Sequence, residues 1–224
     1  WTELPDLAKD VTQPSARHSH SMASVGSSTY MFGGKDADGT VADFWVHEFP
    51  TDALAGNETS HTWTALETPT TMLQEGLVGS MMIANTEFVY LFGGETQSGV
   101  KVGTLHKYDV TAKKWTEHAA APEGISFGLM AFMGDETIYV SDGSTGKIWI
   151  YVISDGAWHE MKCTNEEEKE TDAGMFVTNS AGGSTSAGQF LQFGGIQESG
   201  EIVNSITVLV TDNMVCDEFV VLSV

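Results

Sequence analysis

The sequence predicts an all-β fold, a β-propeller of about four four-stranded blades. The first observation is a short apolar run ended by two glycines, which occurs as YMFGG at 30–34, YLFGG at 90–94 and LQFGG at 191–195. A weaker copy, YVSDG, lies at 139–143, so the run returns about every 50 to 60 residues, as in a repeat architecture. Each copy is typical of a buried strand that leaves the core through a turn with positive φ.

A second observation is the spacing of aromatic residues near the end of each repeat. Tyr108 precedes Trp115 by seven residues, and Tyr151 precedes Trp158 by the same interval. In the last repeat Leu209 and Cys216 keep that interval with smaller side chains. A third observation is that no segment has a capped helical period over about ten residues, so the chain is predicted to be essentially all β.

The repeats are expected at about 14–65, 74–118, 122–162 and 173–224, with four strands in each. In the first repeat the strands are expected at 19–25, 29–32 and 43–47 and from Trp63 onward. In the second they are expected at 80–84, 88–92, 104–110 and 115–117, and in the third at 128–133, 137–140, 148–153 and 158–161. In the fourth they are expected at 175–178, 189–193, 206–210 and 216–222.

Small sheets of this size cannot bury both faces alone, and stacking them around an axis solves the problem. A β-sandwich would not explain a repeated glycine pair. We therefore expect one propeller domain over 1–224, with residues 1–4 as a strand of a preceding or closing blade. Three arrangements remain open: a small or open ring, part of a longer propeller, or a ring closed by 1–4 with 216–224 packed elsewhere.

Composition excludes some partners. The net charge is −21, from ten Lys and Arg against 31 Asp and Glu, and it repels phosphate backbones and anionic lipid heads. The acidic residues are scattered over most loops, which favours a well-solvated surface. The longest apolar runs are far shorter than the roughly 20 residues of a membrane helix, so we expect a soluble protein without direct membrane insertion.

The compartment is left open by the sequence. The chain begins at Trp1, and a targeting signal is not visible. Cys163 and Cys216 are compatible with a disulfide or with two buried thiols, and we favour thiols. Asn57 lies in the only glycosylation sequon.

The residues resemble the kelch-repeat family from about Pro14 to Val224. The resemblance rests on the apolar run into a glycine pair, the following aromatic residue and the tryptophan that opens the last strand. Arg17 and His20 look like the family's Arg and His on the first strand, positions that the resemblance implies to be structural. The third repeat departs from the pattern with Asp142 in place of a glycine, and the fourth lacks both aromatics.

The predicted binding site lies on one propeller face. Loops that join second to third strands share that face with the connections between blades, and propellers commonly bind partners through such loops. The candidate partner-binding residues are Asp36, Asp38, Glu95, Gln97, Gln197, Glu198 and Glu201. The acidic run at 166–170 would lie nearby and is expected to be a solvated loop.

No catalytic, metal-binding or cofactor-binding residues are predicted. The pair Asp36 and Asp38 lacks the rest of a calcium loop, and His18 and His20 lack further ligands at metal-binding spacing. There is no nucleophile elbow and no phosphate-binding glycine loop. Some plant kelch proteins hold iron with Glu, Asp and His at spacings of four, and no such triplet occurs here; galactose oxidase, a copper enzyme of similar fold, has more blades and a further domain.

We therefore expect a non-catalytic protein-protein interaction module, or a subunit of a larger assembly, that binds protein partners and no nucleic acid. The alternative is a carbohydrate-binding or carbohydrate-active domain, in which Trp45 and Trp149 would stack on a sugar. Because the two tryptophans fall at the same place in their repeats, we favour packing between blades as their role. A purely structural subunit is the third class.

Overall fold

The computed structural model describes a series of residue ranges, and the account below is confined to them: 12–49, 62–68, 75–142, 144–145, 147–161, 163–164, 170–171, 181–184, 190–196, 202–209 and 219–221. These residues form strands, turns and bridges, and no α-helix is found among them. The predicted strand at 1–4, the sequon at Asn57 and the cysteine at 216 lie outside these ranges.

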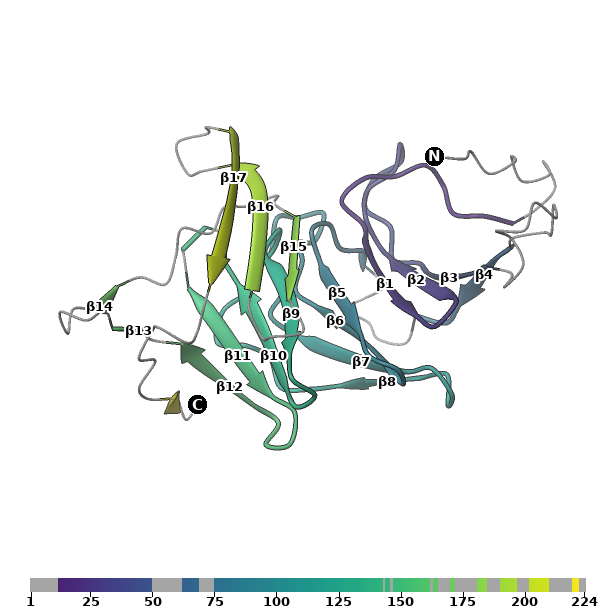
Figure 1. Cartoon of the computed structure of the whole chain (residues 1–224). Coiled ribbons are helices and arrows are strands. Elements are labelled where there is room, and N and C mark those ends of the chain that lie inside the picture. Colours follow the sequence, from purple (N-terminus) through teal and green to yellow (C-terminus); the bar gives the residue numbers. More distant parts are fainter. Residues whose placement is uncertain are drawn as a thin grey trace.

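Antiparallel sheets follow one another along the chain, as the repeats predict (Figure 1). The first contains β1 (Ser21–Val25), β2 (Ser28–Phe32), β3 (Phe44–Glu48) and β4 (Thr62–Leu66). The second contains β5 (Met81–Ala84), β6 (Phe88–Phe92), β7 (Leu105–Asp109) and β8 (Lys114–Glu117). The third contains β9 (Leu129–Met133), β10 (Thr137–Ser141), β11 (Ile148–Val152) and β12 (Ala157–Met161).

The fourth sheet has three strands in the described residues: β15 (Ala181–Ser184), β16 (Phe190–Ile196) and β17 (Ile202–Leu209). A short ribbon of β13 (Cys163–Thr164) and β14 (Glu170–Thr171) lies between the third and fourth sheets in sequence. The first strands of the sheets adjoin one another in order, β1 beside β5, β5 beside β9 and β9 beside β15. These are the blades of a β-propeller, with their first strands innermost.

Strand direction alternates within each blade, so the loops divide between two faces. We call the end that carries the second-to-third-strand loops (β2–β3, β6–β7 and β10–β11) the upper face, because it lies at the top of Figure 1. The end that carries the first-to-second-strand turns (β1–β2, β5–β6 and β9–β10) is the lower face. The two faces expose different side chains to solvent, and each has its own hollow.

The glycine pair lets neighbouring blades approach closely. The N–H of Gly34 donates to the carbonyl of Leu77 at 2.8 Å, ahead of the second blade, and Gly94 repeats this bond with Ile125 ahead of the third. A Cβ on Gly93, whose φ is +67°, would lie 2.3 Å from the Ile125 carbonyl oxygen. The repeated glycine is therefore required both by a left-handed turn and by the next blade.

A ladder of backbone hydrogen bonds links successive blades beside the inner strands. The N–H of Gly79 donates to the carbonyl of Ser19 at 2.9 Å, and the N–H of Phe127 donates to the carbonyl of Gly79 at 2.7 Å. The three residues hold equivalent places ahead of the first, second and third blades, and all have positive φ, near 60°. The hydrogen bonds of the ladder join main-chain atoms alone, so they link the blades without a side-chain donor or acceptor.

Tryptophans tie the outer parts of neighbouring blades together. Tyr108 pairs directly across from Trp115, with ring centroids 5.1 Å apart, and Tyr151 pairs with Trp158 at 5.0 Å, which explains the predicted spacing of seven. Each indole N–H then reaches the carbonyl that follows the last strand of the previous blade: Trp115 donates to Glu67 at 3.3 Å, and Trp158 donates to Ala119 at 2.7 Å.

The hydrophobic core lies between the blades. One cluster fills the space between the first and second blades and includes Phe32, Phe44 and Leu91. A second fills the space between the second and third blades and includes Phe92, Ile138 and Trp149. A single blade is too thin to bury its own faces, so burial between blades supplies most of the apolar contact.

The fourth repeat departs from the expected strands. The strand expected at 175–178 lies outside the described residues, and the described strand beside β9 is Ala181–Ser184. The last described strand, β18 (Phe219–Val221), was expected in the fourth blade, with packing of 216–224 elsewhere left open; it pairs antiparallel with β12 at the edge of the third. An outer strand offers unpaired backbone groups, and β18 uses them. That 1–224 is one domain stays a prediction.

Candidate functional site

Two equivalent loops of the upper face are preformed by their own hydrogen bonds. In the first blade Lys35 forms backbone bridges to His18 and Thr40, and in the second Glu95 does the same with Val78 and Lys101. The tip of the second loop is closed from within, because the N–H of Val100 donates to the Thr96 hydroxyl at 3.2 Å. Such loops offer a partner a fixed surface.

Asp36 is occupied by its own loop. Its Oδ1 accepts hydrogen bonds from the N–H groups of Asp38 and Gly39 at 2.9 and 3.2 Å, and its Oδ2 accepts one from the Ser15 hydroxyl at 2.7 Å. The hydrogen bond from Ser15, followed by that from Asp38, lowers the pKa of Asp36 below its ordinary value. Asp36 therefore shapes the loop, whereas Asp38 is exposed at its tip.

The two loops meet. The Thr40 hydroxyl donates toward Gln97 Oε1 at 3.3 Å and toward the carbonyl of Glu75 at 3.1 Å. Gly39 lies against the amide of Gln97, where an added Cβ would sit 3.2 Å from Oε1. The loops of the first and second blades thus form one continuous surface.

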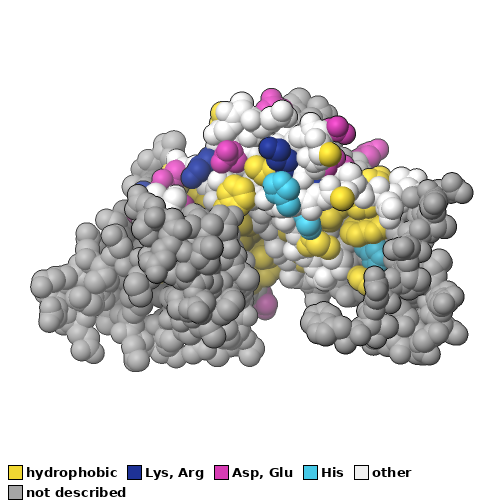
Figure 2. All heavy atoms as spheres, turned by 90° about the horizontal axis from the view of Figure 1, so that it is seen from above, with side chains coloured by type: hydrophobic (Ala, Val, Ile, Leu, Met, Phe, Trp, Pro, Cys, Tyr) yellow, Lys and Arg dark blue, Asp and Glu magenta, His cyan; other side chains and the backbone are white. Residues whose placement is uncertain are grey.

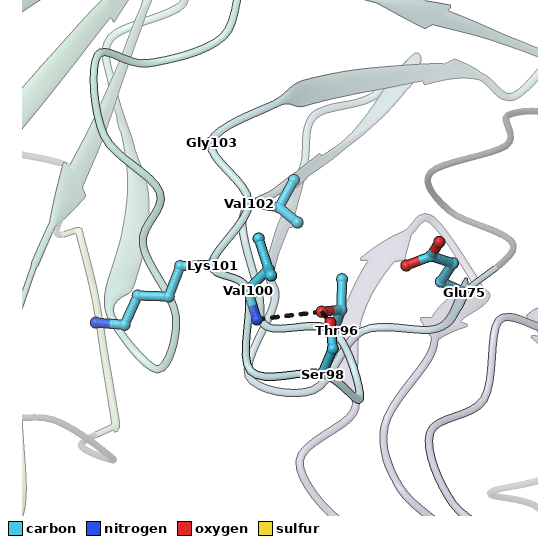
Figure 3. Close-up of a pocket in the computed structure, with 7 residues that line it drawn as sticks. All are labelled: Glu75, Thr96, Ser98, Val100, Lys101, Val102 and Gly103. Atoms are coloured by element: carbon cyan, nitrogen blue, oxygen red, sulfur yellow. Dashed lines mark hydrogen bonds between the residues drawn. The ribbon is translucent and has the colours of Figure 1, made fainter.

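A hollow of about 350 Å³ opens in this surface. It is lined by Glu75, Thr96, Ser98, Val100, Lys101, Val102 and Gly103. Figure 3 shows Glu75 and Lys101 on opposite sides, with the hydroxyl side chains of Thr96 and Ser98 between them. Val100 is 60% exposed, an unusually open position for a large apolar side chain. The hollow therefore presents one positive and one negative side chain, two hydroxyl groups and an apolar rim.

Seen from above in Figure 2, the described part of the upper face carries acidic side chains at several separate places, with basic, histidine and apolar side chains between them. There is no single acidic patch on it. The scattered charge predicted from the sequence is therefore found on the face that was predicted to bind a partner.

The corresponding loop of the third blade is built differently. Asp142 is buried and accepts hydrogen bonds from the N–H and hydroxyl of Ser144 at 2.9 and 2.6 Å and from the Thr145 hydroxyl at 2.9 Å. Burial raises the pKa of Asp142, but these hydrogen bonds together outweigh it and the pKa is lowered. Beside it Lys147 Nζ lies 2.5 Å from Glu123 Oε1, and this hydrogen bond raises the pKa of the lysine.

Arg17 has a structural role, as its kelch-like position implies. Its guanidinium pairs with Asp43, with Nη2 2.9 Å from Oδ2, and Nη1 donates to the carbonyl of Gly33 at 3.0 Å. The indole of Trp45 also donates to Asp43, at 2.7 Å. Burial raises the pKa of Asp43, and the bonds from Arg17 and Trp45 outweigh that effect and lower it. Arg17 is thus used to hold the first loop in place.

Four of the seven predicted site residues lie on the described upper face. Gln97 contacts the loop that carries Asp36 and Asp38, and Glu95 adjoins the hollow and accepts a long, 3.5 Å hydrogen bond from Ser126. Their role in binding stays a prediction. The remaining three, Gln197, Glu198 and Glu201, lie outside the described residues, as do residues 166–169.

Sequence reasoning missed Glu75, Val100 and Lys101 because it considered only polar loop residues that follow the glycine pair. The available signal was a valine and a lysine directly after the turn glycine, Gly99. Trp45 and Trp149 are 8% and 2% exposed, so neither presents an open ring face to a sugar, and Trp149 belongs to the core cluster between the second and third blades, as a packing role predicts.

Within the described residues no three His, Cys, Asp or Glu side chains are grouped closely enough to hold a metal ion. No described helix is long and apolar enough to cross a membrane. The expectation that the protein needs no metal or cofactor stays a prediction.

Comparison with known proteins agrees with the blade structure. Residues 1–143 match the KLHDC2/KLHL20/DRC7 Kelch-repeats domain, and the match covers more than half of the chain. The chain belongs to the kelch-repeat family. It is also similar to a protein of Thlaspi arvense named N-(sulfonatooxy)prop-2-enimidothioate sulfolyase, with 27% identity over 197 residues. That similarity covers 79% of the chain and 53% of the relative, so the chain spans about half the length of the relative.

Proposed function

We propose that this protein is a non-catalytic interaction propeller, or a subunit of a larger assembly, that binds a protein partner through its upper face. The anchor is the hollow lined by Glu75 and by residues of the second-blade loop between 96 and 103. The observation that carries the proposal is the contact between Thr40 and Gln97, which joins two preformed loops beside this open hollow. Membership of the kelch family, whose domains commonly bind proteins, supports it.

The lining indicates what such a partner would present. Val100 offers about the area of one apolar side chain, which a partner's apolar residue would cover. Lys101 and Glu75 stand on opposite sides of the hollow, so they would set the orientation of a partner segment that carries both charges. Because the loops are closed by internal hydrogen bonds, little ordering cost is expected on binding.

Site-specific photocrosslinking tests this proposal. A benzophenone amino acid would replace Gln97 on the upper face or, as the matched control, Thr111 in the β7–β8 turn of the lower face; both residues are exposed. We expect a discrete crosslinked species in extracts of the source cells from position 97 and none from position 111. Val100→Asp and Lys101→Glu, introduced separately into the position-97 protein, should each remove that species.

Two results would contradict the proposal. One is the same set of crosslinks from both faces, which would indicate non-specific contact of a strongly acidic protein. The other is a discrete crosslink that survives both Val100→Asp and Lys101→Glu, which would place the partner away from the hollow. Unchanged thermal melting of the variants would show that the loss of crosslinking does not come from unfolding.

A second candidate function comes from the sulfolyase relative. Its similarity runs over most of the chain, and a related lyase activity is therefore the enzyme hypothesis to test. The purified chain would be incubated with N-(sulfonatooxy)prop-2-enimidothioate, with and without added iron(II), and consumption of the compound followed by mass spectrometry. Enzyme-dependent consumption would replace the non-catalytic proposal. We expect none, because the chain lacks the Glu, Asp and His triplet of iron-binding plant kelch proteins.

A further inference from the structure

A second hollow, of about 690 Å³, opens on the lower face, at the opposite ends of the strands from the proposed partner site. Turns of three blades contribute to it. It is lined by Ser24, Gly26, Ala84, Asn85, Thr86, Glu87, Phe88, Tyr90, Asp135, Glu136 and Ile153. Its volume is in the range of small-ligand sites, and its walls come from rigid β-turns rather than from one loop.

Tyr90 is the buried polar group of this hollow. The residue is only 2% exposed, and its ring packs edge-on against Phe132 with centroids 5.6 Å apart. No described residue forms a hydrogen bond with its hydroxyl, whereas the hydroxyl of Tyr151 bonds to His118 at 2.8 Å. Burial, together with nearby Tyr151 and Glu136, raises the pKa of Tyr90, so the phenol keeps its proton at neutral pH. A hydroxyl at the hollow, on a nearly buried side chain and with no hydrogen bond to a described residue, favours a ligand that supplies one.

The charge of the hollow selects the ligand's sign. Glu87, Asp135 and Glu136 are exposed carboxylates on the turns of the second and third blades. No lysine or arginine is among the described residues that line the hollow. Anions would be repelled, and a cation would meet three carboxylates and a neutral phenol oxygen.

The aromatic wall points to an organic cation rather than a metal ion. Phe88 is half-buried in the wall, and Lys107 Nζ already lies 4.7 Å from the centroid of its ring. The Lys107 ammonium therefore already occupies a cation-π position on this ring, and a ligand would contact Phe88 through its alkyl chain. A bare metal ion would need several ligands at once, and the described residues contain no group of three suitable side chains.

We propose that the lower-face hollow binds an ammonium or guanidinium group on a short alkyl chain. The N–H groups would donate to the Tyr90 hydroxyl oxygen and to the carboxylates of Glu87 and Glu136. The alkyl chain would lie along Phe88 and Ile153. The group can belong to a free amine or to a lysine or arginine side chain of a peptide, and this site is independent of the proposed upper-face function.

The test is a titration of isotope-labelled protein followed by nuclear magnetic resonance. The probes are n-pentylamine, its uncharged analogue 1-pentanol, and an acetylated, amidated Gly-Lys-Gly peptide. We expect saturable shifts with pentylamine, confined to amides near Phe88, Glu136 and Ile153, and none with pentanol. The apparent Kd should rise as salt is added, because the carboxylates are exposed.

Matched variants separate a built site from general attraction to an acidic protein. Tyr90→Phe removes only the hydroxyl, and Glu136→Gln removes one charge on an exposed turn; each should weaken binding about three- to ten-fold, the cost of one hydrogen bond. Asp38→Asn makes the same charge change on the upper face and should leave the Kd unchanged. If Tyr90→Phe lowers stability, the Kd of Glu136→Gln is compared with the Kd of Asp38→Asn instead.

The relative affinities of pentylamine and the peptide identify the source of the cation. Comparable binding of pentylamine and the peptide identifies a free amine as sufficient, while much tighter binding of the peptide identifies a lysine side chain as the source. Shifts spread over the whole acidic surface, absence of saturation with both probes, or equal affinity of the wild type and Glu136→Gln would overturn the proposal. None of these results bears on the upper-face crosslinking test.

Discussion

The second and third blades end their second strands in different ways at the same place. Gly93 adopts a φ of +67° and lets the Ile125 carbonyl approach, whereas Asp142, its equivalent, does not adopt positive φ and accepts three hydrogen bonds from the residues that follow. Both donate a backbone N–H to the next strand, Gly93 to Thr104 at 3.4 Å and Asp142 to Lys147 at 2.9 Å. The chain must therefore turn out of the strand at this position. Either a glycine with positive φ or hydrogen bonds to a side chain can stabilise that turn.

The largest effect is expected from Gly93→Ala. The new methyl group would sit 2.3 Å from the Ile125 carbonyl oxygen, in a conformation that alanine disfavours. Strain in the left-handed region and overpacking together should lower the free energy of unfolding by about 3 kcal/mol or more. Urea denaturation followed by tryptophan fluorescence measures it.

Gly134→Ala is the matched control. Gly134 has nearly the same φ, +64°, but an added Cβ would meet nothing within 4 Å. This variant should cost only about 1 kcal/mol, the backbone strain alone. If the two variants destabilise the protein equally, the approach of Ile125 is not what the glycine pair provides.

The next largest effect on stability is expected from replacing the tryptophan at each of the two junctions between blades. Trp158 is buried and donates to Ala119 at 2.7 Å, while Trp115 is less buried and its bond to Glu67 is 3.3 Å long. Trp158→Phe should cost about 1.5 kcal/mol, since it removes a short, partly buried hydrogen bond, and Trp115→Phe should cost less than about 1. Both variants lose the same volume, so equal values would show that volume rather than the hydrogen bond decides.

The smallest effect is expected from Asp142→Asn. The amide keeps one acceptor but loses the charge, so the variant should be less stable by about 1 kcal/mol at neutral pH. Because the folded pKa of Asp142 is lowered, its ionised form contributes stability above the ordinary carboxyl pKa, and that contribution is lost as pH falls through the folded pKa. The difference between wild type and variant should therefore hold down to about pH 4 and shrink as the pH falls further.

Urea midpoints measured from pH 7 down to pH 3 test this dependence. Asp155→Asn, on an exposed turn of the same blade, removes the same charge without the cluster of hydrogen bonds and serves as the control. A difference for Asp142→Asn that stays constant over this range would rule out ionisation as the source of its stabilising effect.

The first three blades were predictable because their signals are local. The glycine pairs and the Tyr-to-Trp spacing predicted the bounds of β5–β12 to within one or two residues. The spacing is informative because the hairpin register makes positions seven apart face each other. The fourth blade was less predictable. Its inner strand, AGGS at 181–184, lies beside β9 and has almost no apolar pattern in its sequence.

The pairing of β18 with β12 joins residues about 60 apart, and no local pattern specifies which exposed edge a short strand will choose. The upper-face residues could be placed on a face from strand alternation alone. Which loops contact one another could not be predicted from the sequence, because the contact between Thr40 and Gln97 depends on the angle between blades. The lower-face hollow was missed for the same reason, as turns of three blades form it.

The backbone ladder from Phe127 through Gly79 to Ser19 has a consequence for how such chains change in evolution. Every rung joins main-chain atoms of one repeat to main-chain atoms of the one before. A duplicated or deleted repeat would therefore bring a main-chain donor and acceptor already suited to such a rung. The side chains add a further condition, because an added Cβ on Gly79 would lie 2.7 Å from the Phe127 ring, so the residue at each rung must also fit the side chain of its new neighbour.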